Sequence, residues 1–354
     1  VIITTKRGHD GKTNISFRAN VGAQTLARRV GVMNGQEWAK YALEEYSNYD
    51  LYKGTNEYAK ALKLFQSFGW GEDGYSSAPT TDWYDELFST AISQNYERGV
   101  SGGNSKTRFY VSGNYNSTDG IMKETGFRRA TGRVNLTHEI AKWLTLDTKN
   151  TFSRNMYDQA STTGAANPSR TAMLLLPGVS PYDENGDYVM DLPYGYYQYN
   201  IPQTLELCEY YGATSKLTSA NDLTFHILPG LDFKSSYTFE LNYLQEHQYS
   251  DPRTRLGYRY NGVSTAVADD GFNFQTEQVI TWNKKLGRDN LTVTGGFSYT
   301  DHQYHSISAS ATGVAHEDLH LLSSASVLDS MGESFSQWKM AGFFARASYN
   351  LRAR

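Results

Sequence analysis

The sequence predicts an all-β fold: an antiparallel transmembrane β-barrel with long extracellular loops, of which this chain carries about ten strands. Three observations lead there. Apolar and polar residues alternate along many segments, the connections between these segments alternate between short and long, and aromatic residues are abundant. The 354 residues include 27 Tyr, 16 Phe and 6 Trp but 8 Pro. Such a composition suits paired strands better than disorder.

The clearest strand covers residues 231–243. Its odd positions are Leu, Phe, Ser, Tyr, Phe, Leu and Tyr, and its even positions are all charged or polar. Side chains of a strand point to alternate faces, so one face is apolar and the other polar. A transmembrane strand needs about 9–11 residues and only alternate ones apolar. The mean hydropathy of -0.57 therefore does not exclude a bilayer.

Nine further segments follow the same pattern. They are residues 13–24, 92–101, 106–116, 127–138, 143–154, 217–228, 271–282, 290–300 and 343–351. Short connections lie at 101–105, 139–142, 228–231 and 285–290, whereas long connections lie at 25–91, 117–126, 155–216, 250–270 and 312–337. Outer-membrane barrels have short periplasmic turns and long outer loops. A large soluble β-sandwich is the alternative, but it has no reason to collect its short turns at one end.

The first long connection contains a predicted helix at residues 34–46. Asn34 is a suitable N-cap, and Glu37 three residues later completes a capping box. Trp38, Tyr41, Ala42 and Glu45 share one face of this helix. We expect that face to pack against the barrel rim.

The polar faces of the strands predict a hydrated or plugged lumen. A closed barrel satisfies its backbone groups without water, so it can cross lipid while its charged side chains face inward. The lumen-facing candidates are Arg108, Arg133, Asp232, Lys234, Glu240, Glu277 and Arg346. The apolar faces would then contact outer-membrane lipid.

Particular motifs in the first 155 residues resemble the SusC/RagA family of TonB-linked outer-membrane transporters. The runs VIITTKRG (1–8) and GKTNISF (11–17) resemble the family's junction between plug and first barrel strand. The run VMNGQEWA (32–39) resembles its first-loop helix. The runs SGGNSKT (101–107), YVSGNY (110–115) and DGI (119–121) are similar to its next hairpin.

This resemblance implies a plugged barrel of about 22 strands in the outer membrane of a Bacteroidota-like, Gram-negative bacterium. It implies active import of oligosaccharides or peptides, with a SusD-like surface lipoprotein as partner and energy from the TonB complex. Residues 1–10 would be the end of the plug domain and residues 11–354 the N-terminal part of the barrel. Because both ends fall at apparent strands, we expect a fragment of a longer protein.

Two other functions stay open. One is a different TonB-dependent receptor, for a siderophore or cobalamin. The other is a non-transporting surface β-barrel or adhesin. The first-loop helix favours the SusC type.

Aromatic residues in the long loops are the candidate substrate contacts. Flat rings pack on the apolar faces of sugars, and phenol hydroxyls can hydrogen-bond. The candidates are Trp70, Trp83, Tyr194, Tyr196, Tyr197 and Tyr199. The alternatives are packing within the loops and contact with the partner lipoprotein.

No pattern predicts catalysis, a cofactor, a metal site or nucleic-acid binding. The sequence contains no HExxH, GxSxG or Walker motif, and its net charge is -4. Cys208 is the single cysteine, which excludes an internal disulfide. Asp183, Asn185 and Asp187 have the spacing of a calcium loop, but Gly186 comes one position early and Tyr194 stands where a bidentate Glu is needed. A turn is the favoured interpretation.

Overall fold

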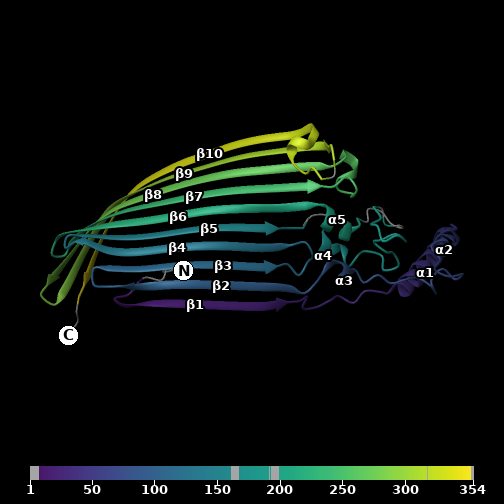
Figure 1. Cartoon of the computed structure of the whole chain (residues 1–354), viewed down its shortest axis with the longest axis horizontal. Coiled ribbons are helices and arrows are strands. Elements are labelled where there is room, and N and C mark those ends of the chain that lie inside the picture. The colour runs from purple at the N-terminus through teal and green to yellow at the C-terminus, as the bar shows by residue number, and fades with distance from the viewer. Residues whose placement is uncertain (1–7, 161–166, 191, 193–198, 317, 352–354) are drawn as a thin grey trace.

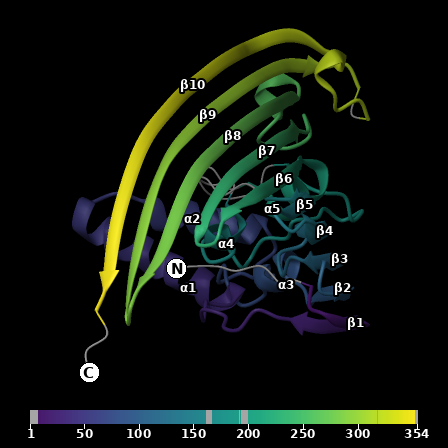
Figure 2. The same ribbon diagram turned by 90° about the vertical axis from the view of Figure 1, so that its left-hand side faces the viewer.

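A single open sheet of ten antiparallel strands dominates the molecule. The computed structural model describes residues 8–160, 167–190, 192, 199–316 and 318–351. The strands are neighbours in sequence order from β1 to β10. They run side by side, with the helices of the long loops gathered at one end (Figure 1), and the sheet curves strongly (Figure 2). The predicted barrel-wall fold is confirmed.

All ten predicted strands are present, but several are longer than predicted. Strands β6 to β10 run for 20 to 26 residues each. The strands are β1 Gly11–Gln24, β2 Ala91–Gly103, β3 Thr107–Asp119, β4 Gly126–Ala141, β5 Leu144–Asp158, β6 Glu209–Leu228, β7 Leu231–Ser250, β8 Val263–Leu286, β9 Asp289–Val314 and β10 Ala325–Asn350. A bilayer needs only about half of such a strand, so the rest extends beyond the lipid.

The connections are correspondingly shorter than predicted. The expected long connection at 117–126 is reduced to residues 120–125, and those at 250–270 and 312–337 to 251–262 and 315–324. The tight turns at the opposite end cover 104–106, 142–143, 229–230 and 287–288. Gly230 adopts a φ of 83°, which favours glycine in such a turn. Every connection at the loop end is still longer than every turn at the turn end.

The strand register separates an apolar face from a polar face. On the apolar face Val111 of β3 lies opposite Val134 of β4, and Phe239 of β7 opposite Phe274 of β8. On the polar face the register connects Arg108, Thr137, Asp147, Asp222, Ser236 and Glu277 in one continuous row across six strands. The register thus assigns alternate residues of each strand to the two faces, although the apolar face of β5 and β6 also carries polar residues.

The predicted first-loop helix exists and is longer than expected. It is α1, Gly35–Lys53. The predicted capping box is confirmed: the Glu37 N–H donates to Asn34 Oδ1 at 2.8 Å, and the Asn34 N–H donates to Glu37 Oε2 at 3.0 Å. The helix ends at Gly54, whose left-handed φ of 68° forms a C-cap.

The predicted packing face of α1 is wrong in part. Tyr41 is 53% exposed and Glu45 is exposed, whereas Ala39, Ala42 and Leu43 are buried. The helix packs against α2, Glu57–Ser67, and the following loop. The sequence pattern did not predict α2, and contact with α2 determines which side of α1 is buried.

The main hydrophobic core lies in the long loops rather than in the sheet. It joins the 25–90 connection with the 159–208 connection, so neither loop has to bury its apolar residues alone. The other helices here are α3 Trp83–Leu87, α4 Pro168–Thr171 and α5 Ile201–Leu207. We call this unit the loop module. Its buried core includes Ala39, Leu43, Phe65, Trp70, Trp83, Leu87, Leu175, Leu176, Val179 and Ile201. No helix among the described residues is long and apolar enough to cross a membrane.

Candidate functional site

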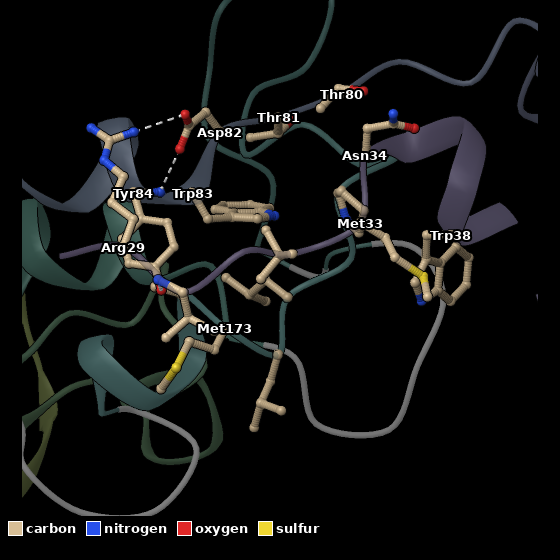
Figure 3. A pocket seen from close by; sticks show the side chains of 16 residues that line it. Arg29, Met33, Asn34, Trp38, Thr80, Thr81, Asp82, Trp83, Tyr84 and Met173 are labelled. Atoms are coloured by element: carbon tan, nitrogen blue, oxygen red, sulfur yellow. Dashed lines mark hydrogen bonds and ion pairs between the residues drawn. The ribbon is translucent and has the colours of Figure 1, made fainter. Parts of the chain in front are cut away.

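A half-open cavity of about 530 Å³ lies in the loop module between three chain segments (Figure 3). The segments are 29–34 before and into α1, 80–84 at the start of α3, and 172–177 after α4. The first two belong to one long connection and the third to the other. The cavity therefore exists only because the two loops pack together.

Arg29 and α3 hold one side of this cavity. The Arg29 guanidinium pairs with the carboxylates of Asp82, at 3.0 Å, and Asp85. Asp82 also caps α3 by accepting from the Tyr84 N–H at 2.9 Å. The Val30 N–H donates to the Tyr84 hydroxyl at 3.2 Å. Since two carboxylates neutralise Arg29, this side offers little attraction to a free anion.

The second long loop is fastened to α3 by backbone and indole hydrogen bonds. Trp83 Nε1 donates to the Leu176 carbonyl at 2.9 Å, and the Thr81 N–H donates to the Pro177 carbonyl at 2.7 Å. Apolar side chains at the cavity mouth stay exposed: Met33, Met173 and Leu174. Methionine side chains adapt to irregular apolar shapes. The cavity is thus suited to an apolar or amphipathic group.

The predicted loop aromatics occupy three kinds of position. Trp70 is 3% exposed, with its ring 4.9 Å from that of Phe65, so it belongs to the core. Trp83 is 4% exposed but lines the cavity. Tyr199 is partly buried against the same core. Tyr194, Tyr196 and Tyr197 lie outside the described residues. Loop packing accounts for Trp70, and substrate contact by the others stays a prediction.

The seven predicted lumen-facing residues all lie on the polar face by register. Two of them form cross-strand ion pairs between β6 and β7: Lys234 with Asp222 at 2.8 Å and Glu240 with Lys216 at 3.0 Å. Asp232 Oδ1 is hydrogen-bonded to His226 Nδ1 at 2.8 Å across the same two strands. Glu277 accepts from Gln275 Nε2 at 3.3 Å, and Arg133 Nε donates to Thr151 at 3.4 Å. Arg108 and Arg346 lie opposite Thr137 and Thr294.

Sequence reasoning missed the partners of these charges, because β6 alternates weakly. Lys216 and Asp222 occupy even positions of β6, but Ser219 and Asn221 interrupt the apolar residues between them. The even spacing of Lys216, Asp222 and His226 is the signal that could have identified them. Paired charges keep the polar face hydrated without a large net charge.

Asp183 organises a turn. Its carboxylate accepts from the N–H groups of Asn185, at 2.8 Å, and Asp187, at 2.9 Å. The bond from Asp187 is the main cause that lowers the pKa of Asp183 below its ordinary value, since it favours the charged form. Asp183 Oδ1 therefore already accepts two hydrogen bonds within the turn. Within the described ranges, no three His, Cys, Asp or Glu side chains come together as a metal site.

The curated proteins that this chain resembles in sequence include several TonB-dependent receptors. No family model matches the chain. TonB-dependent receptor P3 of Formosa agariphila is 22% identical over the whole chain, which covers 34% of that receptor. TonB-dependent receptor SusC of Bacteroides thetaiotaomicron is 24% identical over 84% of the chain and 29% of SusC. The chain thus spans about a third of the length of the curated relatives it matches.

The fold comparison points the same way. A structure of the RagAB peptide transporter superposes on 98% of this chain with a TM-score of 0.78, at 18% identity and over 41% of that transporter chain. A second RagAB structure, in the closed-closed state, gives a TM-score of 0.77. These relatives confirm the predicted resemblance, the barrel-wall fold and the location in the outer membrane.

Proposed function

We propose, for a chain related in sequence and fold to SusC/RagA-type TonB-dependent receptors, that it forms part of a barrel that imports nutrients across the outer membrane. The observation that carries this proposal is the two-faced wall, whose polar side holds cross-strand ion pairs and whose loop end carries a packed module with a cavity. An apolar outer face suits lipid, and a charged inner face suits a hydrated path or a plug.

The division of the chain is part of this proposal. Residues 1–10 would be the end of the plug domain and residues 11–354 the N-terminal part of the barrel. The start of β1 at Gly11 supports this boundary. Residues 1–7 lie outside the described part of the chain.

The substrate we propose is an oligosaccharide, with a peptide as the second candidate. Trp83 and the apolar cavity mouth support a ligand with flat apolar faces. Peptide import is supported by the likeness to the RagAB peptide transporter. A SusD-like surface lipoprotein would cover the loop end, and the TonB complex would supply energy. The described residues offer no catalytic arrangement in support of an enzyme.

Uptake by a deletion strain tests the function. Cells that lack the gene should lose uptake of at least one labelled oligosaccharide or peptide, and the full-length gene should restore it. A strain without TonB should show the same loss. Normal uptake of all glycans and peptides tested would contradict import.

The two alternatives are distinguished by the same strains. Loss of siderophore or cobalamin uptake with normal glycan and peptide uptake would favour the other receptor class. Loss of surface adhesion with no uptake defect would favour an adhesin. Recovery of the full-length protein in the aqueous phase without detergent would contradict the membrane barrel altogether.

A further inference from the structure

The apolar face of the sheet carries a second cavity near the loop end. This groove has a volume of about 600 Å³ and crosses strands β4 to β9. The register places Ala213 opposite Gln245, which faces Ala268, and Tyr211 opposite His247, which faces Ala266. The floor of the groove therefore combines three alanines with larger polar side chains, all on the same face as Phe239 and Phe274.

The groove begins where the apolar belt ends. On β7 the apolar face reads Phe239, Leu241 and Tyr243 and then changes to Gln245 and His247. On β5 it changes from Phe152 to Arg154. The end of an apolar belt marks the boundary between lipid and water. Because the groove lies toward the long loops, this boundary is the outer one.

Two guanidinium groups line one side of the groove. Arg128 of β4 and Arg154 of β5 are exposed and lie on the apolar face. Arg154 Nη1 donates to Ser215 Oγ at 3.3 Å, and neither arginine forms an ion pair within the described part of the chain. The same lining holds two carboxylates: Asp158, which is also exposed, and Glu246, which lies on the polar face by register and accepts a hydrogen bond from the Tyr157 hydroxyl. Arginine on a lipid face costs about 2–4 kcal/mol at midplane but only ~0–1 kcal/mol near the interface.

The other end of the groove is closed by the loop between β9 and β10. His247 Nε2 lies 3.0 Å from the His320 carbonyl, and Ser264 Oγ donates to the same carbonyl at 2.7 Å. Leu322 of this loop lines the groove. The rings of Tyr211 and His247 lie 5.1 Å apart beneath it. The wall is thus fixed by hydrogen bonds rather than left open.

We propose that this groove binds a phosphorylated glycolipid of the outer leaflet. Its phosphate would pair with Arg128 and Arg154, its sugar would lie on the alanine floor, and its acyl chains would run down the apolar belt. Charge complementarity and the position at the outer boundary carry the proposal. A protein partner, unlike a glycolipid, would have no reason to place an apolar segment in the bilayer and a phosphate at its outer boundary. The proposal does not depend on the imported substrate.

Native mass spectrometry of the full-length protein in detergent tests this site. The probes are a bisphosphorylated lipid A, its dephosphorylated form and phosphatidylglycerol. We expect the wild type to retain the phosphorylated lipid A most strongly. Losing both charge-assisted contacts in an Arg128→Gln/Arg154→Gln variant should weaken retention by about tenfold or more.

Two further variants separate charge from shape. Ala268→Phe fills the floor without changing charge and should also reduce retention. Arg129→Gln is the matched control, because Arg129 neighbours Arg128 on β4 but lies on the polar face with Asn155. It should retain lipid as the wild type does. Heat-modifiable migration on a gel verifies that each variant is folded.

Three results would overturn the proposal. One is equal retention of phosphorylated and dephosphorylated lipid A. Another is unchanged retention in the double arginine variant and in Ala268→Phe. The third is cross-linking from residue 268 in cells that captures a protein, or a second copy of the chain, in place of lipid. A preference for phosphatidylglycerol would contradict the glycolipid as well.

Discussion

At the scale of single residues, the N-cap of α1 offers the cleanest test of the loop module. Replacing Asn34 by Ala removes the acceptor for the Glu37 N–H and should cost about 1 kcal/mol of local stability. Hydrogen exchange of the α1 amides in the full-length protein measures this change. Asn56→Ala is the control, because Asn56 begins α2 without a side-chain cap bond. Equal effects of the two substitutions would contradict the assigned cap.

A second residue-scale prediction concerns acid. Asp73 accepts from the Ser76 N–H at 2.8 Å and the Tyr75 N–H at 3.0 Å, and these bonds, that from Ser76 first, lower the pKa of Asp73. A carboxyl with a lowered pKa stabilises the fold above its ordinary pKa, and this contribution is lost as pH falls through the folded pKa.

The 71–78 turn should therefore exchange its amides faster, relative to intrinsic rates, at pH 3 than at pH 6. In Asp73→Asn this difference should disappear, because the amide side chain does not titrate. A pH dependence of the same size in Asp73→Asn would contradict the role of this carboxylate.

At the scale of elements, the apolar face of β7 predicts unequal tolerance of neighbouring positions. Phe239 points to the apolar face and Thr238 to the polar face. Phe239→Lys should destabilise the full-length barrel by about 2–4 kcal/mol, whereas Thr238→Lys should change stability by less than ~1 kcal/mol. Urea unfolding from vesicles measures both. Similar effects at the two positions would show that the faces are assigned wrongly.

The same alternation explains which elements the sequence could predict. The first part of β7, residues 231–243, is predicted correctly because contact with lipid requires an apolar residue at every second position. The first part of β8, with Ala266, Ala268 and Asp270 on the apolar face, extends beyond the lipid, so its sequence carries no such demand. Strand ends there are fixed by hydrogen bonds to neighbouring strands instead. Propensity alone cannot locate them.

Polar residues weaken the alternation in the middle of two further strands, although both were predicted. Thr148 and Asn150 of β5 and Ser219 and Asn221 of β6 lie on the apolar face and hydrogen-bond one another, with Thr148 Oγ1 donating to Asn221 at 2.6 Å. The bond from Thr148 joins the two strands, and those from Asn150 and Asn221 lie within β5 and β6; the cross-strand partner is not revealed by a single strand's sequence. For the same reason, the sequence predicted charged polar-face residues but not their ion-pair partners, and predicted loop aromatics but not the burial of Trp70.

At the scale of the whole molecule, the two sheet edges determine how the chain behaves by itself. Among the described strands, β1 and β10 each pair on one side only. In lipid, each backbone N–H or C=O group without a hydrogen-bond partner raises the free energy of the inserted state by several kcal/mol. Residues 1–354 expressed alone should therefore aggregate rather than insert. Flotation with vesicles measures insertion, and a stably inserted monomer of this length would contradict the open sheet.

The central claim is that one face of this wall meets lipid and the other meets water. A spin-label scan of positions 237–242 in the full-length protein, with every native cysteine, Cys208 included, replaced by Ser, tests it most directly. Labels at 237, 239 and 241 should be relaxed mainly by oxygen, which concentrates in lipid. Labels at 238, 240 and 242 should be relaxed mainly by a water-soluble nickel complex. Loss of this two-residue period, with both faces open to the nickel complex, would contradict a membrane-spanning wall.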